Sequence, residues 1–248
     1  MRLNGKTAIV TGGASGFGAG IVAKFVSEGA RVMIADINGD AAQAMAAQIG
    51  AGAIAQTVDV ANGASVQAMT DAALTTFGHV DILINNAGIS HMPTPLEDVS
   101  EDDFDRVFNV NMKSVYLTAR ALVPHMKTRK QGVILNVAST AGVSPRPRLN
   151  WYNASKGWMI TATKTMAVEL APDGIRVNAI NPVAGETPLL KTFMGQDTPE
   201  IRAKFLSTIP LGRFSQPEDM GNAACFLCSD EASMITGVAM EVDGGRCI

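Results

Sequence analysis

The chain begins with a short apolar run, a glycine-rich turn and a helical pattern, in that order. The run Thr7-Ala8-Ile9-Val10 is typical of a buried strand, and Thr11-Gly12-Gly13-Ala14-Ser15-Gly16-Phe17-Gly18 follows it at once. A helical pattern then extends from Ala19 to Glu28. Such a turn brings backbone N–H groups to the positive end of a helix, where a pyrophosphate can bind. A glycine-rich turn can also serve only to connect a strand to a helix, without binding a ligand.

The second expected strand favours one kind of nucleotide. Arg31 to Ala35 ends in Asp36, at the end of that strand. A carboxylate in this place accepts hydrogen bonds from the ribose hydroxyls of an adenosine and repels a 2′-phosphate. No Arg or Lys lies in the glycine turn or directly after Asp36, so NAD is favoured over NADP. The alternative is that Asp36 only starts the turn at 37–39.

Strands and helices continue to alternate along the chain. We expect a helix over 40–49, a strand over 53–58 that ends before Asp59, a helix over 65–77, and a strand over 81–84. Helical segments of this length between strands predict a parallel sheet that is covered by helices on both faces. No linker, internal repeat or block of like charge divides the 248 residues, so one domain over 1–248 is expected.

Composition narrows the kinds of partner. Apolar residues make up 47% of the chain, charged residues 17%, and the formal net charge is −3, which does not favour nucleic acid or an anionic membrane. The low charge content indicates that part of the surface is covered in a homo-oligomer. The N-terminus has no signal-peptide pattern, and no apolar run approaches the ~20 residues of a membrane span. We therefore expect a soluble, cytoplasmic protein.

The cysteines and histidines do not form a metal pattern. Cys225 and Cys228 are spaced as in a zinc site, but the chain has only one further cysteine and its three histidines are scattered. The two cysteines lie in an apolar helical stretch, which favours buried thiols over a metal or redox role. No metal is expected.

Tyr152 and Lys156 are the strongest candidates for chemistry. They are four residues apart, so on a helix they lie on one face, one turn apart. An ammonium close to a phenol lowers the phenol's pKa toward the range in which an acid/base catalyst works. Ser139 follows the apolar run 133–138, which is typical of a buried strand, and its hydroxyl can bind a substrate oxygen opposite the tyrosine. Most Tyr-x-x-x-Lys pairs are solvated helix faces, so the pair gains weight only with the rest of the chain.

Together these motifs resemble the classical short-chain dehydrogenase/reductase family. The glycine turn 11–18, Asn85-Asn86-Ala87-Gly88, Ser139 and the Tyr152/Lys156 pair occur in that family's order and spacing, and the likeness extends from Gly5 to Gly245. The resemblance implies a doubly wound, Rossmann-type sheet of seven parallel strands, a substrate lid at about 186–212, and a homotetramer. It also implies hydride transfer between the nicotinamide of NAD and a carbon that bears oxygen.

The resemblance assigns roles residue by residue. Tyr152 is then the general acid/base, Ser139 binds the substrate oxygen, Lys156 lowers the tyrosine pKa and binds the nicotinamide ribose, and Asn111 holds a water in a relay to the lysine. The cofactor-binding positions it implies, besides Tyr152 and Lys156, are Gly12, Ser15, Gly16, Phe17, Gly18, Asp36, Ile37, Asp59, Val60, Asn86, Ala87, Gly88, Pro182, Val183 and Thr187. Val183 stands where the family usually has a glycine, so the resemblance does not predict the backbone conformation between Pro182 and Thr187.

Substrate identity depends on the segments between the motifs. Candidate substrate contacts are His91, Arg146, Arg148, Asn150 and Trp151. Either arginine could bind an anionic group through a bidentate contact, or both could point to solvent or to a neighbouring subunit. Asn150 and Trp151 would suit a polyol or sugar. Three functions are open: an NAD-dependent dehydrogenase of secondary alcohols, sugars, polyols or hydroxy acids, a 3-oxoacyl-thioester reductase, and a catalytically silent nucleotide-binding scaffold.

Overall fold

Seven strands lie side by side in one parallel sheet, in the order β3-β2-β1-β4-β5-β6-β7. The structure is a computed structural model that describes all 248 residues. The strands are β1 (Thr7–Thr11), β2 (Arg31–Asp36), β3 (Ala53–Thr57), β4 (Ile82–Asn85), β5 (Gly132–Val137), β6 (Ile175–Pro182) and β7 (Ala239–Val242). The order reverses between β1 and β4, and in such sheets ligands bind at that point, outside the carboxyl ends of the strands.

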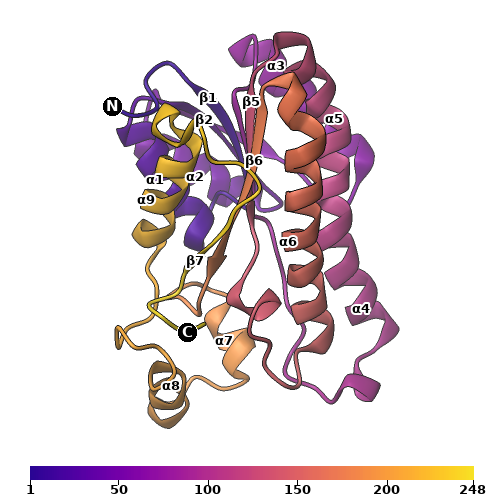
Figure 1. Cartoon of the computed structure of the whole chain (residues 1–248), viewed down its shortest axis with the longest axis vertical. Helices are drawn as coiled ribbons and strands as arrows, with labels where there is room; N and C mark the ends of the chain where they lie inside the picture. The colour runs from indigo at the N-terminus through magenta and orange to yellow at the C-terminus, as the bar shows by residue number, and fades with distance from the viewer.

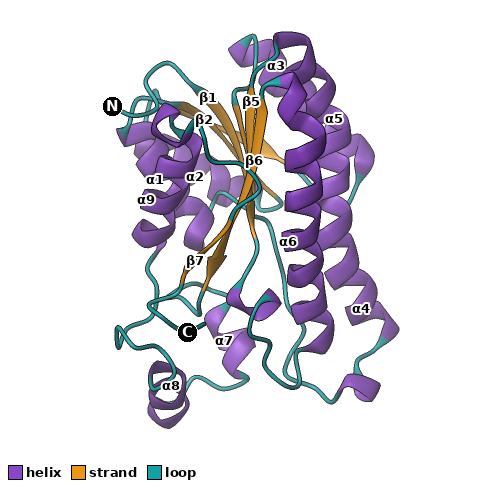
Figure 2. Cartoon of the chain, viewed as in Figure 1, coloured by secondary structure: helices purple, strands orange, loops and turns teal.

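Helices cover both faces of this sheet (Figures 1 and 2). The helices are α1 (Gly16–Ser27), α2 (Gly39–Ile49), α3 (Gly63–Phe77), α4 (Glu101–Phe108), α5 (Ser114–Arg129), α6 (Asn150–Leu170), α7 (Leu190–Met194), α8 (Pro199–Leu206) and α9 (Pro217–Cys228). In Figure 1, α1, α2 and α9 lie on one side of the sheet, α3 to α6 lie on the other, and α7 and α8 lie beyond its edge. The predicted fold class, a doubly wound Rossmann-type domain, is confirmed.

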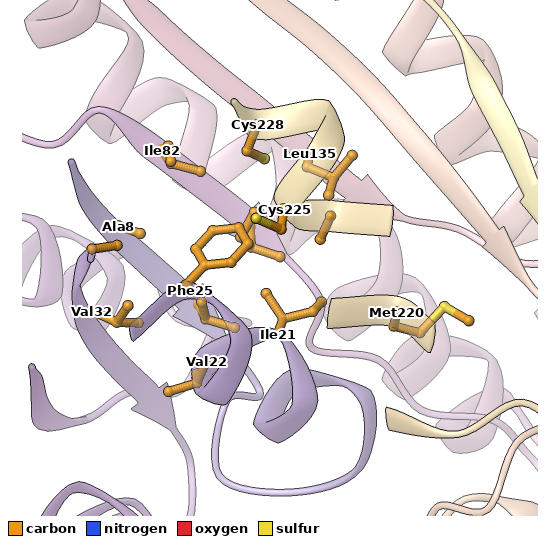
Figure 3. Packing of buried hydrophobic residues seen from close by; sticks show 14 of the residues in the cluster. Ala8, Ile21, Val22, Phe25, Val32, Ile82, Leu135, Met220, Cys225 and Cys228 are labelled. Carbon is orange, nitrogen blue, oxygen red and sulfur yellow. The ribbon is translucent and has the colours of Figure 1, made fainter. Parts of the chain in front are cut away.

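Alternation of side chains along the strands gives each face its own apolar core. Ala8 and Val10 of β1 pack with α1 and α9, whereas Ile9 between them packs with α3, α5 and α6. Figure 3 shows the first core, in which the Phe25 ring of α1 lies against Cys225 of α9. Cys225 and Cys228 are buried and free, as predicted, and burial raises the pKa of both thiols. Buried free thiols of raised pKa are unreactive, so their role is packing.

Local signals explain where the helices begin and end. The Ser100 side chain caps α4 by accepting from the Asp103 N–H at 3.2 Å, and Pro217 opens α9 within a capping box made by Gln216 and Asp219. Gly78 ends α3 in the left-handed conformation. The predicted boundaries agree with the structure to within three residues, the largest difference being the start of α1, which was expected at Ala19 and lies at Gly16. Between α4 and α5 the helical path continues through a π-helical turn over Asn109–Lys113.

Two glycines allow α1 and α9 to cross in close contact, which leads to a prediction about stability. A side-chain carbon at Gly20 would lie 2.1 Å from the carbonyl oxygen of Pro217, and one at Gly221 would lie 2.6 Å from the carbonyl oxygen of Gly20. We therefore expect Gly20→Val to lower the free energy of unfolding by about 3 kcal/mol, since overpacking of a core costs that much when neither backbone can move. Urea denaturation measures it.

Gly157 in α6 is the matched control for that experiment. A side-chain carbon there would have its nearest neighbour at 3.8 Å. Gly157→Ala should therefore leave stability unchanged or raise it by about 0.5–1 kcal/mol, because alanine is the better helix former. Equal losses in the two variants would show that the crossing of α1 and α9 is not the tight contact described here.

Candidate active site

A cavity of about 470 Å³ lies at the carboxyl edge of the sheet. Six of the seven strands direct their carboxyl ends toward it. Residues that end or directly follow these strands line it, namely Gly12 after β1, Asp36 in β2, Val58 to Val60 after β3, Asn86 to Gly88 after β4, Ala138 and Ser139 after β5, and Pro182 and Val183 at the end of β6. The cavity therefore occupies the place where a doubly wound sheet binds its ligand.

The glycine turn at the start of α1 is shaped for close approach. Gly12 and Gly16 have φ values of +60° and +52°, and a side-chain carbon at Gly18 would lie 2.0 Å from the carbonyl oxygen of Gly12. Gly12, Ser15, Gly16 and Phe17 line the cavity, whereas Gly18 lies behind them and makes the tight turn possible. Unlike α4 and α9, α1 has no acidic residue in its first turn and no side-chain cap. Its first N–H groups thus remain available to an anion such as a pyrophosphate.

Asp36 is held at the end of β2 by two backbone amides. Its carboxylate oxygens accept from the N–H groups of Ala14 and Asn38, both at 3.0 Å. Each oxygen retains a further lone pair toward the cavity, which Asp36, Ile37, Asp59 and Val60 all line. The only basic side chains that line the cavity are Arg146 and Lys156, and neither belongs to this end. The residues at this end could hold the adenosine part of a nicotinamide dinucleotide.

The loop after β4 is joined to the end of β1 by hydrogen bonds that sequence reasoning did not foresee. The Thr11 hydroxyl donates to the carbonyl of Ile84 and accepts from the N–H groups of Asn86 and Ala87. The Asn86 side chain donates to the carbonyls of Thr11 and Gly12, both at 2.9 Å. Asn86, Ala87 and Gly88 line the cavity, as the resemblance implies, and the Asn86 side chain fixes the glycine turn.

The segment after β6 forms the opposite wall. Pro182, Val183 and Thr187 line the cavity, and a side-chain carbon at Gly16 would lie 3.2 Å from Cβ of Thr187. A side-chain carbon at Gly185 would lie only 2.4 Å from the Phe17 ring. Gly185, two positions after Val183, therefore allows this segment to pack against the start of α1.

Tyr152, Ser139 and Lys156 are buried together in the cavity wall. Tyr152 is 5% exposed and Lys156 4%, and the two lie on one face of α6 as their spacing predicts. Ser139, two residues after β5, lines the cavity together with Tyr152, and its hydroxyl accepts from the Ala141 N–H at 3.0 Å. The Lys156 ammonium donates to the carbonyl of Val137 at 2.8 Å and lies 5.9 Å from the centre of the Tyr152 ring. Lys156 has no carboxylate partner, so a buried cation faces the cavity and fits the ribose hydroxyls of a dinucleotide.

The expected lowering of the Tyr152 pKa by Lys156 is not found. Burial raises the pKa of Tyr152 to about 12, and the neighbouring Ser139 side chain offsets only part of that rise. Burial also lowers the pKa of Lys156 to about 8. The physical reason is that desolvation disfavours the charged form of both groups, and at this separation it exceeds their attraction. Tyr152 is consequently a phenol at neutral pH, ready to donate a proton.

The low pKa of Lys156 predicts a pH dependence of stability. In the unfolded chain the lysine has its ordinary pKa of about 10.5. Between about pH 8 and 10.5 the unfolded state therefore binds more protons than the folded state, so stability rises with pH. We expect the free energy of unfolding of the wild type to rise relative to Lys156→Met by on the order of 2 kcal/mol across this window. Denaturation of both proteins at about pH 7.5 and about pH 10 measures the difference. A constant difference would contradict a buried, poorly solvated ammonium.

Asn111 lies in the π-helical turn, which turns its side chain toward the loop after β4. It is fully buried, accepts from the Ile89 N–H, and donates to the Ile89 carbonyl and the Ser155 hydroxyl. A side-chain carbon at Gly88 would lie 3.4 Å from the Lys156 ammonium and 3.5 Å from Oδ1 of Asn111. The glycine thus leaves a space between these two polar groups. The water relay through Asn111 stays a prediction.

Only one of the five expected substrate contacts lines the cavity, and that is Arg146. Arg148 has a φ of +68° and is exposed, and Asn150 is exposed at the start of α6. The Trp151 ring contacts Phe104 edge-on at 5.4 Å, because it projects from another side of α6 than Tyr152 does. His91 is buried beside Met92, with Nδ1 2.8 Å from that residue's carbonyl oxygen. We therefore remove these four from the substrate contacts.

The cavity contains aromatic residues that the sequence did not reveal. The Phe193 ring of α7 lies 5.0 Å from the Tyr152 ring, and Phe205 of α8 also lines the cavity. Both come from the segment between β6 and α9, which has a small apolar core of its own. No sequence signal distinguishes these two from the other phenylalanines of the chain.

Comparisons with known proteins agree with this geometry. A family model described as enoyl-(acyl carrier protein) reductase matches residues 12–246. The 4-formylbenzenesulfonate dehydrogenase of Comamonas testosteroni is 50% identical to the chain, over the full length of both. The chain belongs to the short-chain dehydrogenase/reductase family. It is an oxidoreductase, and its family binds a nicotinamide cofactor.

Other members of the family are similar over nearly the whole chain. The D-threitol dehydrogenase of Mycolicibacterium smegmatis is 38% identical, over 100% of this chain and 95% of its own. The crystal structure of a 3-ketoacyl-(acyl-carrier-protein) reductase from Brucella melitensis, complexed with NADH, superimposes with a TM-score of 0.95 at 52% identity and covers 99% of this chain and 100% of its own. These short-chain dehydrogenases/reductases thus include alcohol dehydrogenases and an acyl reductase, which share the fold described above.

Proposed function

We propose that this short-chain dehydrogenase/reductase transfers a hydride between NAD and a carbon that bears an alcohol or ketone oxygen. The substrate class is a secondary alcohol or ketone of the sugar, polyol or hydroxy-acid type. The observation that carries the proposal is the placement of Tyr152, Ser139 and Lys156 in the wall of one cavity that also contains Asp36. No helix of the fold has both the length and the apolar character needed to span a bilayer.

The proposed residue roles account for the proton and the oxygen. Bound NAD would supply the hydride acceptor for the carbinol carbon, and its reduced form the hydride donor in the reverse reaction. In oxidation the Tyr152 phenol first passes its own proton to the relay water and on to solvent. The resulting phenolate then takes the hydroxyl proton of the alcohol, while the C–H bond breaks with its electron pair and the C=O bond forms. In reduction the Tyr152 hydroxyl gives its proton to the carbonyl oxygen. Ser139 positions that oxygen, Lys156 binds the nicotinamide ribose, and Asn111 holds the relay water. The contribution of Tyr152 to the rate is about 10²–10⁴-fold.

A preference for NAD over NADP follows from the adenosine end of the cavity. Asp36 presents a carboxylate where a 2′-phosphate would lie, and no basic side chain lines that end. Two solved relatives support the choice. The Brucella melitensis reductase is complexed with NADH, and a xylitol dehydrogenase that is 30% identical, with a TM-score of 0.92, is bound to NAD⁺. Like charges brought together in this way cost several kcal/mol.

The absorbance of reduced nicotinamide tests the proposal. Pooled secondary alcohols, polyols and hydroxy acids would be incubated with the enzyme and either NAD or NADP. We expect turnover with NAD. Turnover only with NADP would contradict the assignment of Asp36, and the absence of turnover despite measured NAD binding would favour a catalytically silent scaffold.

A 3-oxoacyl-thioester reductase is the second candidate. The name of the Brucella melitensis relative at 52% identity favours it. An acetoacetyl thioester supplied with NADH or NADPH separates the two candidates, because only the acyl reductase consumes the reduced cofactor faster with the thioester than with simple ketones.

The proposal includes the setting of the enzyme. We propose that residues 186–212, with α7 and α8, form a lid over the substrate of a single domain spanning 1–248, and that the enzyme is a cytoplasmic homotetramer. Partly exposed Phe104, Phe108 and Tyr116 on and near α4 and α5 support an apolar interface between subunits. The free, buried Cys225 and Cys228 suit a reducing compartment.

A further inference from the structure

Two arginines lie close together beside the substrate part of the cavity. Arg146 lines the cavity, and the nearby charge of Arg246 contributes to a lowered pKa of Arg146, after burial. Neither Arg146 nor Arg246 takes part in an ion pair with a carboxylate, although five other arginines of the chain do. Two neighbouring cations without an anion are unfavourable in a partly buried place, so an anionic ligand would be stabilised there.

Arg146 is held in place but keeps donors free. Its carbonyl oxygen accepts from the Asn153 side chain at 2.7 Å, which ties it to α6 next to Tyr152. Its guanidinium lies 4.1 Å from the centre of the Phe205 ring and donates one hydrogen bond, to the Thr208 hydroxyl at 3.2 Å. A guanidinium has five N–H donors in a planar fork, so most of them remain for a carboxylate or sulfonate.

Arg246 supports this position from behind. It donates to the hydroxyl of Ser144 at 3.1 Å, and Ser144 itself lines the cavity. Its buried Nε has no hydrogen-bond partner. A buried charged donor that lacks a partner is costly, so negative charge brought close to Arg246 and Arg146 would be stabilised.

We propose that Arg146, supported by Arg246, binds a carboxylate or sulfonate group of the substrate while the reacting carbon lies at Tyr152. The rings of Phe193 beside Tyr152 and Phe205 beneath Arg146 favour an aromatic body between the two ends. Within the proposed hydroxy-acid class, the substrate is thus a secondary alcohol, or its ketone, with an aromatic ring between the reacting carbon and a carboxylate or sulfonate. This inference rests on the proposed function. A relative that is 50% identical is named for a substrate with a sulfonate on a benzene ring.

Arg146 also joins the body of the enzyme to the lid, and the experiment must separate the two roles. Its contacts with Phe205 and Thr208 would hold α8 even if no anion bound. Loss of a latch would weaken binding of charged and neutral ligands alike. Loss of an anion subsite would weaken binding of the charged ligand only.

Calorimetric binding of unreactive ligands to the NAD-saturated enzyme provides the test. The probes are para-toluenesulfonate and para-toluate, with the neutral para-toluenesulfonamide and para-toluamide as isosteric controls. We expect Arg146→Gln to weaken binding of the better anion by about 10- to 100-fold, the effect of losing hydrogen bonds to a charged group. Comparison of the affinities of para-toluenesulfonate and para-toluate shows which anionic group binds better.

Three further variants complete the design. Arg148→Gln removes the same charge from an exposed arginine two residues away, and Thr208→Val removes the latch contact while keeping the Arg146 charge; both should leave anion affinity within about twofold of the wild type, well below the value of one charged hydrogen bond. Arg246→Gln should weaken binding of the anion by a smaller factor than Arg146→Gln does.

The outcomes are distinct from those for the proposed function. Undetectable binding of both anions to the wild type, equal affinity in Arg146→Gln, or equal losses for anion and amide would each overturn the subsite. NAD binding is measured in the same instrument. Anion binding that depends on Arg146 without turnover of any alcohol would leave the subsite standing and remove the proposed activity.

Discussion

Tyr152→Phe is expected to lower kcat by about 10²–10⁴-fold while the affinity for NAD stays within about twofold of the wild type. The substitution removes one oxygen and leaves the ring that packs 5.0 Å from Phe193. Without that oxygen, the residue next to Ser139 in the cavity wall can no longer exchange a proton with the substrate oxygen. Initial rates at saturating alcohol, together with calorimetric titration of NAD, measure both quantities.

The chain supplies a matched control in its only other tyrosine. Tyr116 lies in α5, is 52% exposed, and accepts a hydrogen bond from Arg120. Tyr116→Phe makes the same chemical change far from the cavity, and it should leave kcat unchanged. A Tyr152→Phe variant that retained more than about a tenth of wild-type kcat would assign the proton transfer to another group.

Asp36→Asn is expected to reduce the preference for NAD by on the order of 100-fold, measured as the ratio of kcat/KM for NAD to that for NADP. The carboxylate that repels a 2′-phosphate becomes a neutral amide of nearly the same shape. General damage to the site affects both cofactors, so the ratio isolates the charge. The amide must also adapt to the N–H groups of Ala14 and Asn38, which can lower both values together.

Asp59→Asn is the control for this change in charge. Asp59 also lines the cavity, at the end of β3, where the resemblance places the adenine and not the ribose phosphate. We expect its ratio to stay close to that of the wild type. An unchanged ratio in Asp36→Asn, or equal changes in both variants, would mean that Asp36 does not select the cofactor.

Features that depend on chain order were predictable from the sequence. Parallel strands bring their carboxyl ends to one edge, so residues such as Gly12, Asp36 and Ser139 had to converge once the alternation of strands and helices was recognised. The helical spacing of Tyr152 and Lys156 placed both on one face of α6 in the same way.

Features that depend on burial and on local backbone geometry were not predictable. Whether Lys156 lowers the tyrosine pKa depends on the balance of desolvation and distance, which spacing does not give. Arg146 and Arg148 are equivalent in the sequence, and only the hydrogen bond from Asn153 and the positive φ at Arg148 send one into the cavity and the other to solvent. Phe193 and Phe205 reach the site because of the path that the chain takes between β6 and α9, which no sequence pattern predicts.

Transfer of deuterium from the carbinol carbon of a labelled alcohol tests the central claim most directly. The alcohol would be the best substrate from the pooled assay, and mass spectrometry would locate the label after a single turnover. Direct hydride transfer predicts that the reduced nicotinamide carries the deuterium and that water carries none. Recovery of the label in water, with an unlabelled reduced cofactor, would contradict the account.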